Sequence, residues 1–308
     1  MAGLGCFSDS VAPIQMMDLL GLLPELIAFG IILGTMYALL SIGVSLVFGV
    51  CGVVNIAHGE FVMLGAYITF WSWALFNINP IVTLPISMSF LFLVGLFLGR
   101  VLISRISGKG LLASMMLTFG ISIFLWNTAE VVFTPIFRSV EYFGEPLSLG
   151  FVTASKAYFI GFVLALLLLV IFFALLKFSM GGKAIRATAQ NRQLALACGV
   201  NTKKVESVSF ALGALLAGAC GSIVAMTWTI YPQMGLTYLT KAFAIVVIGG
   251  LGSIPGAFLG AYIFGIAESV SIQFLTIRMS QILPFGIIVL ILLAKRGGLL
   301  SSGGGPGE

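Results

Sequence analysis

The residues best suited to chemistry lie in one short stretch of this sequence, GVVNIAHGEFVMLGAY, at residues 52–67. It holds His58, which is the only histidine of the chain, and Glu60 two positions later. An imidazole and a carboxylate can carry protons or bind a polar ligand. In a continuous helix, residues two apart point to different sides, so His58 and Glu60 are not expected to form a catalytic pair. Asn55 would share a side with His58.

The composition shows what kind of element must position these residues. Hydrophobic residues make up 60% of the chain and charged residues 8%, and the mean hydropathy is +1.17. Soluble domains are roughly 45–50% apolar and about 25% charged. The excess apolar surface requires a bilayer as solvent, in which only helices and closed barrels satisfy the backbone. Because the alternation of barrel strands is absent, the sequence predicts an all-α polytopic membrane protein.

Apolar stretches long enough to span a bilayer recur along the chain, and we predict about 8–10 transmembrane helices of about 20 residues each. A transmembrane domain is thus predicted over 22–297, after an N-terminal segment (1–21) and before a flexible tail (298–308). The stretches are 22–49, 52–76, 81–104, 111–137, 156–178, 206–230, 240–270 and 280–295.

The first of two predicted helix interruptions lies near residues 52–60. Asn55 and Gly59 tolerate irregular backbone, which favours a break there. Backbone groups freed inside a membrane need partners from the protein or from a water-filled cavity. Two hypotheses remain open: these residues, together with His58 and Glu60, brace the break, or they line a substrate path.

The second predicted interruption is the sequence VIGGLGSIPGAFLG, near residues 249–256. Glycine and proline disfavour a continuous helix, so we favour two short helices that fold back within the stretch 240–270. Lys241 and Glu268 lie near opposite ends of this stretch, where long charged side chains are expected to extend toward the membrane interface. Bracing and path-lining again remain open for the residues of the interruption, which are Gly249, Gly250, Gly252, Pro255 and Gly256.

The distribution of Lys and Arg predicts the orientation, because cytoplasmic loops are enriched in them. No Lys or Arg precedes Arg100, so the N-terminus is expected outside, in the periplasm. Counting the spans from there places the basic stretch 179–205 in the cytoplasm. The connection 138–155, which carries Glu141 and Glu145, falls outside.

The basic stretch SMGGKAIRATAQNRQLALACGVNTKKVES starts at Ser179 and predicts a short helix outside the membrane. The pair Gly181-Gly182 is expected to end the preceding helix. Residues Ala184–Cys198 are good helix formers, and Gly199 is suited to cap such a helix. From the residues alone two hypotheses remain open: the stretch holds anionic lipid headgroups, or it docks a soluble partner.

Three blocks of sequence resemble a known family. They are LGTMYALLSIGVSLVFGVCGVVNIAHGEFVMLGAY, AIRATAQNRQLALACGVNTKKV and KAFAIVVIGGLGSIPGAFLGAYIFGIAES, in this order along the chain. In them the chain is similar to the LivH-type permeases of bacterial branched-chain amino acid ABC transporters, over most of residues 22–297. The elements NxAHGE and GGxGSxxGA carry most of the resemblance.

The resemblance implies a bacterial inner-membrane subunit that translocates amino acids, branched-chain ones above all, delivered by a periplasmic binding protein. It implies a second permease of the LivM type or a second copy of the chain, and two ATP-binding subunits that use ATP and Mg. The chain itself would bind no cofactor, and no nucleic-acid partner is expected. Residues 179–205 would be a coupling loop that docks to an ATP-binding subunit. The candidate docking residues are Lys183, Arg186, Arg192, Ala195 and Gly199.

Motifs that the sequence lacks narrow the remaining functions. Without G-x-x-x-x-G-K-[ST] the chain has no nucleotide site of its own, and without H-E-x-x-H or a cysteine cluster it offers no metal site. Two other classes stay open: a self-sufficient proton-coupled secondary transporter that uses His58 and Glu60, and an intramembrane hydrolase with a serine near His58. The cargo is open as well, since permeases related to this family carry urea, short amides or other amino acids.

Overall fold

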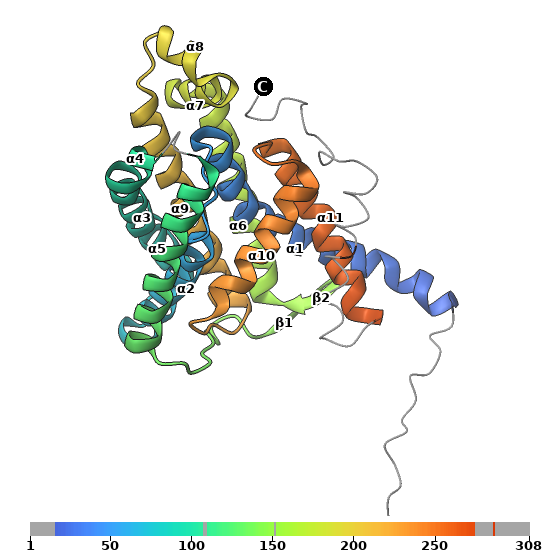
Figure 1. Ribbon diagram of the computed structural model, residues 1–308. Coiled ribbons are helices and arrows are strands. Elements are labelled where there is room, and N and C mark those ends of the chain that lie inside the picture. The colour runs from blue at the N-terminus through green and yellow to red at the C-terminus, as the bar shows by residue number, and fades with distance from the viewer. Residues whose placement is uncertain (1–15, 107–109, 151, 275–285, 287–308) are drawn as a thin grey trace, which may run out of the picture.

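The computed structural model describes the chain as a bundle of helices with one small β-hairpin (Figure 1). The described residues are 16–106, 110–150, 152–274 and 286. The predicted last span, 280–295, lies outside them except for Gly286, and so do the tail 298–308 and residues 1–15. The first helix begins at Met16, within the segment 1–21 that the sequence predicts to precede the membrane domain.

Two long helices, α1 (Met16–Cys51) and α9 (Thr202–Thr227), form the centre of the bundle. In their apolar windows 89% and 83% of the residues are buried. Helices this apolar can pack closely in a membrane where small residues let the backbones approach each other. A Cβ atom on Gly213 of α9 would lie 3.1 Å from the carbonyl oxygen of Gly43 of α1. The two helices therefore supply the frame that positions the candidate sites.

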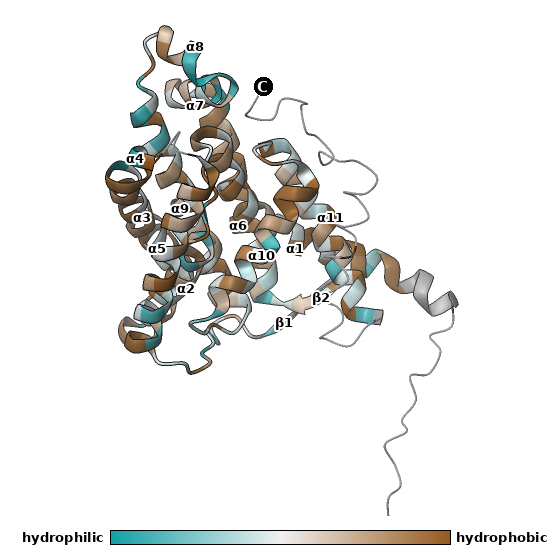
Figure 2. Cartoon of the chain, in the orientation of Figure 1, coloured by the Kyte–Doolittle hydropathy of each residue, from teal (hydrophilic) through white to brown (hydrophobic). Residues whose placement is uncertain are grey.

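Three apolar helices at the outside of the bundle are mostly exposed: α3 (Pro80–Leu98), α5 (Leu111–Phe133) and α6 (Lys156–Phe178). Only 28%, 17% and 28% of the residues in their apolar windows are buried. Figure 2 shows hydrophobic residues along these helices. Among the described residues, six helices are long and apolar enough to cross a membrane. These observations confirm the predicted all-α polytopic membrane fold.

Both predicted interruptions are present. Residues 52–57 separate α1 from α2 (His58–Phe76), and residues 250–253 separate α10 (Met234–Gly249) from α11 (Ile254–Phe274). Helices α10 and α11 pack against each other as a hairpin, which confirms the predicted fold-back (Figure 1).

Two predicted helix ends need correction. The stretch 111–137 stops being helical after Phe133, because Thr134 has a φ of +61° and Pro135 has no backbone N–H to continue the helix. The stretch predicted to end at residue 104 continues to Ile106. Beyond α3 the chain forms a π-helix, η1 (Gly99–Ile103), and then the short α4 (Ser104–Ile106).

The two ends of the bundle differ in character. At one end lie α7 (Met180–Gln190) and α8 (Arg192–Ala197), where Figure 2 shows hydrophilic residues gathered. At the other end β1 (Pro146–Leu149) pairs antiparallel with β2 (Val152–Ser155), as Figure 1 shows.

An exposed ion pair closes the base of this β-hairpin. Lys156 donates a hydrogen bond to Glu145 and so lowers the pKa of that carboxyl. Glu145 therefore stays ionised, and the pair persists, as the solution becomes mildly acidic.

Candidate translocation and coupling sites

The break between α1 and α2 is held by a residue of α5. Thr118 Oγ1 lies 3.0 Å from the Val54 carbonyl oxygen, which it can donate to, and it accepts a hydrogen bond of 3.2 Å from the Ile56 N–H. Both are backbone groups that lie between the two helices. Since freed backbone groups in a membrane need a protein partner, Thr118 braces the break directly.

Replacing Thr118 by valine keeps the shape of the side chain and removes this hydroxyl. The Ile56 N–H then loses its acceptor, and we expect the free energy of unfolding to fall by about 1–3 kcal/mol, the usual cost of an unsatisfied buried polar group. Thermal unfolding of the purified subunit in detergent measures the loss. Thr118→Ser retains the hydroxyl and is the matched control. Equal stability of the valine and serine variants would show that the break does not depend on Thr118.

The His58 side chain contacts α1, whereas its backbone N–H donates to the Asn55 carbonyl in the break. Its Nε2 atom lies 3.1 Å from the Leu40 carbonyl oxygen. A carbonyl only accepts, so Nε2 carries the proton and Nδ1 is left as an acceptor. Nδ1 is buried and has no hydrogen-bond partner among the described residues.

Glu60 faces a different neighbour, as the two-residue spacing predicts. Ser122 of α5 donates a hydrogen bond of 3.2 Å to Glu60 Oε1. The other oxygen, Oε2, is buried without a partner in the described part of the chain. The side chain lies against Gly235 of α10, where an added Cβ would sit 2.5 Å from Oε2. His58 and Glu60 thus contact separate helices, and no hydrogen bond between them is present in the described structure.

Other unused polar groups accompany Glu60 along α2 and the break before it. In a low-dielectric interior such groups are costly unless a ligand or water satisfies them. The segment therefore has spare hydrogen-bonding capacity for a polar ligand. The buried atoms without a partner in this part of the described structure are Asn55 Oδ1, His58 Nδ1, Glu60 Oε2, Tyr67 OH, Thr69 Oγ1 and Trp71 Nε1.

The second interruption is a tight turn. Gly250 and Gly252 have positive φ values of 100° and 81°. The helices on either side touch at Gly249 and Gly256, where a Cβ on Gly256 would lie 2.1 Å from the Gly249 carbonyl oxygen. Pro255 is exposed and lies in the first turn of α11.

The turn also contacts the end of α1. A Cβ on Gly49 would lie 2.9 Å from the carbonyl oxygen of Gly252. The two interruptions, although they are far apart in sequence, are therefore neighbours in space.

Lys241 and Glu268 do not extend separately to the interface, contrary to the prediction. The fold-back at residues 250–253 brings the two ends of the stretch together, and Lys241 Nζ lies 2.6 Å from Glu268 Oε1. The exposed fractions of the two side chains are 16% and 11%. The charges thus satisfy each other inside the protein.

The predicted coupling loop, residues 179–205, contains two helices where one was predicted over Ala184–Cys198. Helix α7 ends at Gln190 because Asn191 adopts an extended conformation, with φ −157° and ψ 108°. The Asn191 side chain accepts a hydrogen bond from the Leu194 N–H and so caps α8.

The helix boundary predicted at Gly181-Gly182 is also wrong. Helix α6 ends at Phe178, and Ser179 caps α7 by accepting a hydrogen bond of 2.9 Å from the Gly182 N–H. The two glycines thus lie inside the first turn of α7, where a serine cap outweighs their low helix propensity.

The predicted cap at Gly199 is confirmed. Its φ is +82°, a conformation that glycine adopts without strain. The Gly199 N–H donates to the Leu196 carbonyl and the Val200 N–H donates to the Ala195 carbonyl, which together form a Schellman motif.

The structure separates the other candidate docking residues by exposure. Lys183 and Arg186 are exposed on α7, and Arg186 also donates to the Leu176 carbonyl at the end of α6. Ala195 is only 4% exposed, so its methyl group packs inside this chain.

Arg192 of α8 connects the coupling loop to the bundle. Its Nε atom lies 2.7 Å from Oε1 of Glu206 in α9, an ion pair that lacks the alignment of a hydrogen bond. Glu206 is 0% exposed. Its backbone carbonyl accepts a hydrogen bond from the Cys51 thiol at the end of α1, with an S–O distance of 3.4 Å. The loop, α9 and the first interruption therefore form one connected set.

Sequence reasoning missed the partners of these polar groups, although α5 carried a signal. Ser114, Thr118 and Ser122 are spaced four apart, which places them on one side of a helix. All three are buried although α5 is mostly exposed. A buried polar stripe on an apolar helix marks the side that contacts other polar groups, here the break and Glu60.

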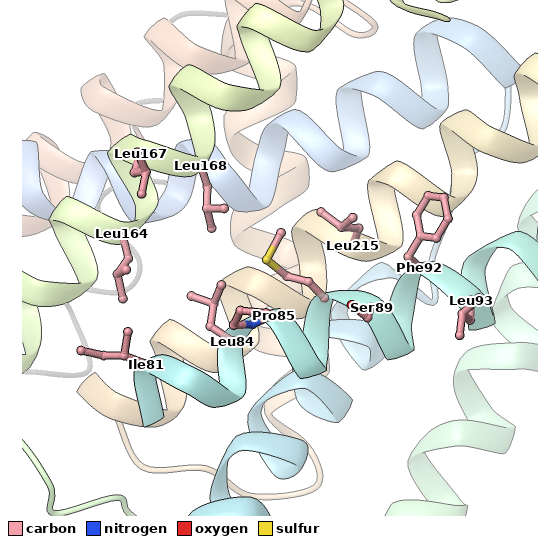
Figure 3. Close-up of a pocket in the computed structure, with 11 residues that line it drawn as sticks. Ile81, Leu84, Pro85, Ser89, Phe92, Leu93, Leu164, Leu167, Leu168 and Leu215 are labelled. Atoms are coloured by element: carbon pink, nitrogen blue, oxygen red, sulfur yellow. The ribbon is translucent and has the colours of Figure 1, made fainter. Parts of the chain in front are cut away.

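A pocket of about 650 Å³ lies away from this polar set, between α3, α6 and α9. Figure 3 shows apolar side chains around it, with Ser89 as the one labelled polar residue. Its surroundings suit an acyl chain or an apolar helix and offer no partner for a charged cargo.

Comparison with known proteins places the chain among permeases. The family described as "Branched-chain amino acid transport system / permease component" matches residues 26–292. The permease protein LivH of the high-affinity branched-chain amino acid transport system of Salmonella typhimurium is 31% identical over 294 residues, and the match covers 88% of this chain and 93% of LivH. The corresponding BraD of Pseudomonas aeruginosa is 30% identical over 287 residues, with the same coverage of both chains.

A third relative is another permease protein of such a system. The permease protein LivM of Escherichia coli is 25% identical over 300 residues, and the match covers 86% of this chain and 67% of LivM. No solved structure matches the chain.

Proposed function

Because the chain belongs to the family of permease components of branched-chain amino acid transport systems, we propose that it is the membrane-spanning subunit of an ATP-driven importer. The cargo is an amino acid, most of all a branched-chain one, delivered by a periplasmic binding protein. The single observation that carries this proposal is the family match over residues 26–292.

The coupling loop supports an ATP-driven mechanism. Its two short helices, α7 and α8, lie at one end of the bundle (Figure 1). They combine the exposed cations Lys183 and Arg186 with the exposed apolar side chains of Leu194 and Leu196, which are 65% and 52% exposed. A mixed basic and apolar tip can contact a cleft of a protein partner through both charged and apolar groups.

The partners follow from what the chain lacks and from its relatives. The sequence contains no phosphate-binding motif of the type G-x-x-x-x-G-K-[ST], so two separate ATP-binding subunits use ATP and Mg. The relative LivM is a second type of permease, and our chain pairs with a subunit of that type or with a second copy of itself.

The chain lies in the bacterial inner membrane with the coupling loop in the cytoplasm and its N-terminus outside. The basic residues of 179–205 support this orientation. Cysteines at Gln190 and Ser148, placed one at a time in a cysteine-free chain, should react with an impermeant thiol reagent from opposite sides. Labelling of Gln190 from outside would reverse the orientation.

The cargo path includes the region around Glu60. Three observations support this placement: the unpartnered Glu60 Oε2, the neighbouring break at residues 52–57, and Ser122, which fixes the carboxylate from α5. Thr118 already braces the backbone of the break. The side chain of Glu60 is therefore left available for a polar cargo.

The function is tested with the transporter reconstituted in liposomes, with both permeases, the ATP-binding subunits and the binding protein. We expect leucine uptake that requires internal ATP and the binding protein. Uptake by this chain alone, driven by a proton gradient, would support a secondary transporter instead. Competition by urea or short amides, without competition by branched-chain amino acids, would change the cargo.

Gly199→Leu tests the coupling loop within this assembly. Leucine at a φ of +82° strains the backbone by about 1–2 kcal/mol, so we expect a distorted α8, weaker retention of the ATP-binding subunits and lost uptake. Among the described residues no neighbouring atom lies within 4 Å of a Cβ at Gly199, so the membrane helices should stay folded. Gly199→Asn is the matched control, because asparagine tolerates this conformation. Normal uptake by the leucine variant would mean that the loop is not the coupling element.

A further inference from the structure

Three side chains from three helices meet in a buried charged group that the path around Glu60 does not include. Lys241 of α10 donates hydrogen bonds to Glu268 Oε1 of α11 at 2.6 Å and to the Tyr37 hydroxyl of α1 at 2.7 Å. Its ammonium also lies over the Tyr37 ring, 4.8 Å from the centroid. Tyr37 is 2% exposed.

The ion pair is not needed to hold these helices together. Small residues already bring α11 against both neighbours, since a Cβ on Gly260 would lie 2.7 Å from the Ile245 carbonyl oxygen of α10 and one on Gly30 of α1 would lie 2.6 Å from the Ile266 Cα atom. A buried ion pair often stabilises no better than apolar residues of the same size. Ionisable residues inside a membrane protein usually serve function.

From this arrangement we infer that Lys241, Glu268 and Tyr37 bind the charged backbone of the amino acid cargo. The inference rests on the proposed function, since it gives that transporter a second cargo contact inside this subunit. A free amino acid carries an ammonium and a carboxylate, and the site offers one charge of each complementary sign.

The site retains bonding capacity for such a ligand. The two hydrogen bonds of Lys241 use two of its three N–H groups. Glu268 Oε2 is buried and has no partner in the described part of the chain. One N–H donor of the Lys241 ammonium and one acceptor oxygen of the Glu268 carboxylate are thus left for the carboxylate and the ammonium of a zwitterion.

Binding leaves every charge of the site paired. In this structure Lys241 and Glu268 pair with each other. When the cargo enters, its carboxylate takes the Lys241 ammonium and its ammonium takes the Glu268 carboxylate. One ion pair becomes two, the net charge stays zero, and no charge is left unpaired in a medium of low dielectric constant.

An aromatic wall beside the pair suits the aliphatic part of the cargo. The Tyr37 ring stacks on Trp228, with centroids 6.5 Å apart and planes at 7°, and meets Phe264 edge-on at 5.8 Å. Trp228 also contacts Tyr158 and Tyr238. Such rings give apolar surface with little loss of side-chain entropy, which favours a branched hydrocarbon side chain.

The test uses the whole reconstituted transporter with a Lys241→Met, Glu268→Met double variant. Replacing both partners of a buried pair by apolar residues of similar size is often neutral for folding. We expect normal assembly and binding of the ATP-binding subunits, with leucine uptake lowered at least about tenfold because a charged cargo loses its partners. Uptake at the wild-type level would overturn the inference.

A charge-swapped variant, Lys241→Glu with Glu268→Lys, supplies a second readout. A purely structural pair works in either direction, so the swap would then restore both assembly and uptake. A binding site also depends on its position beside Tyr37, and we expect assembly without uptake. Restored uptake overturns the inference, and so does failure of both double variants to assemble, because the pair would then serve folding.

The control is the exposed pair at the β-hairpin. Lys156→Met with Glu145→Gln removes an ion pair of the same chemistry elsewhere, and uptake should stay unchanged. A wild-type transporter that takes up no leucine and binds no ATP-binding subunits would contradict the proposed function. If the Lys241→Met, Glu268→Met variant takes up leucine as fast as the wild type, the binding site is contradicted and the proposed function is not.

Discussion

Gly59→Ala is expected to prevent α2 from seating against α10 and to remove most of the assembled protein. A Cβ at this position would lie 2.0 Å from the Gly235 carbonyl oxygen and 3.0 Å from the Leu239 Cβ. The nearest atom belongs to a helix backbone and cannot turn aside as a side chain would. We expect a loss of about 3 kcal/mol, at the upper end of the range for overpacked sites.

The measurement is the yield of monodisperse subunit in size-exclusion chromatography, with its thermal unfolding in detergent. Gly120→Ala is the matched control, because Gly120 is also a helical glycine and, in the described part of the chain, no neighbouring atom lies within 4 Å of a Cβ added there. Alanine favours a helix over glycine, so this variant should be as stable as the wild type or more so. Equal yields of the Gly59 and Gly120 variants would mean that α2 and α10 do not make this contact.

Arg192→Ala is the second change with a large expected effect. It leaves the carboxylate of Glu206, which is 0% exposed, without its ion-pair partner. Breaking a buried pair from one side costs about 3–5 kcal/mol. The Arg192 side chain is 42% exposed, so we expect a loss of about 3 kcal/mol, at the low end of that range.

A double-mutant cycle separates the pair from other effects. Arg192→Ala, Glu206→Gln removes the unpaired charge and should recover most of the lost stability in thermal unfolding. Lys204→Ala is the control, because Lys204 is an exposed cation of the helix that carries Glu206 and forms no salt bridge in the described structure. If the double variant were no more stable than Arg192→Ala, the ion pair would not be what stabilises the loop.

The membrane helices were predictable because their signal is local. The stretch 156–178 has the bounds of α6, and the breaks at residues 52–57 and 250–253 lie where glycine and asparagine predict interruptions. Length and apolar composition suffice for such elements, since each helix satisfies its own backbone.

The site was harder to predict because its partners come from distant segments. Thr118 reaches the break from α5, and Lys241 meets Glu268 only after the chain folds back. The end of α7 was not predicted because the composition of residues 184–198 favours one continuous helix. Instead, the Asn191 side chain accepts a hydrogen bond from the backbone and caps the next helix.

The contact between Gly49 and Gly252 links the two interruptions mechanically. Atoms at closest approach can separate but cannot come nearer, so the last turn of α1 cannot advance unless residues 250–253 move as well. Cys51, two residues further on, contacts Glu206, the partner of Arg192 in the coupling loop. A displacement that begins at the loop therefore has a path of direct contacts to both interruptions.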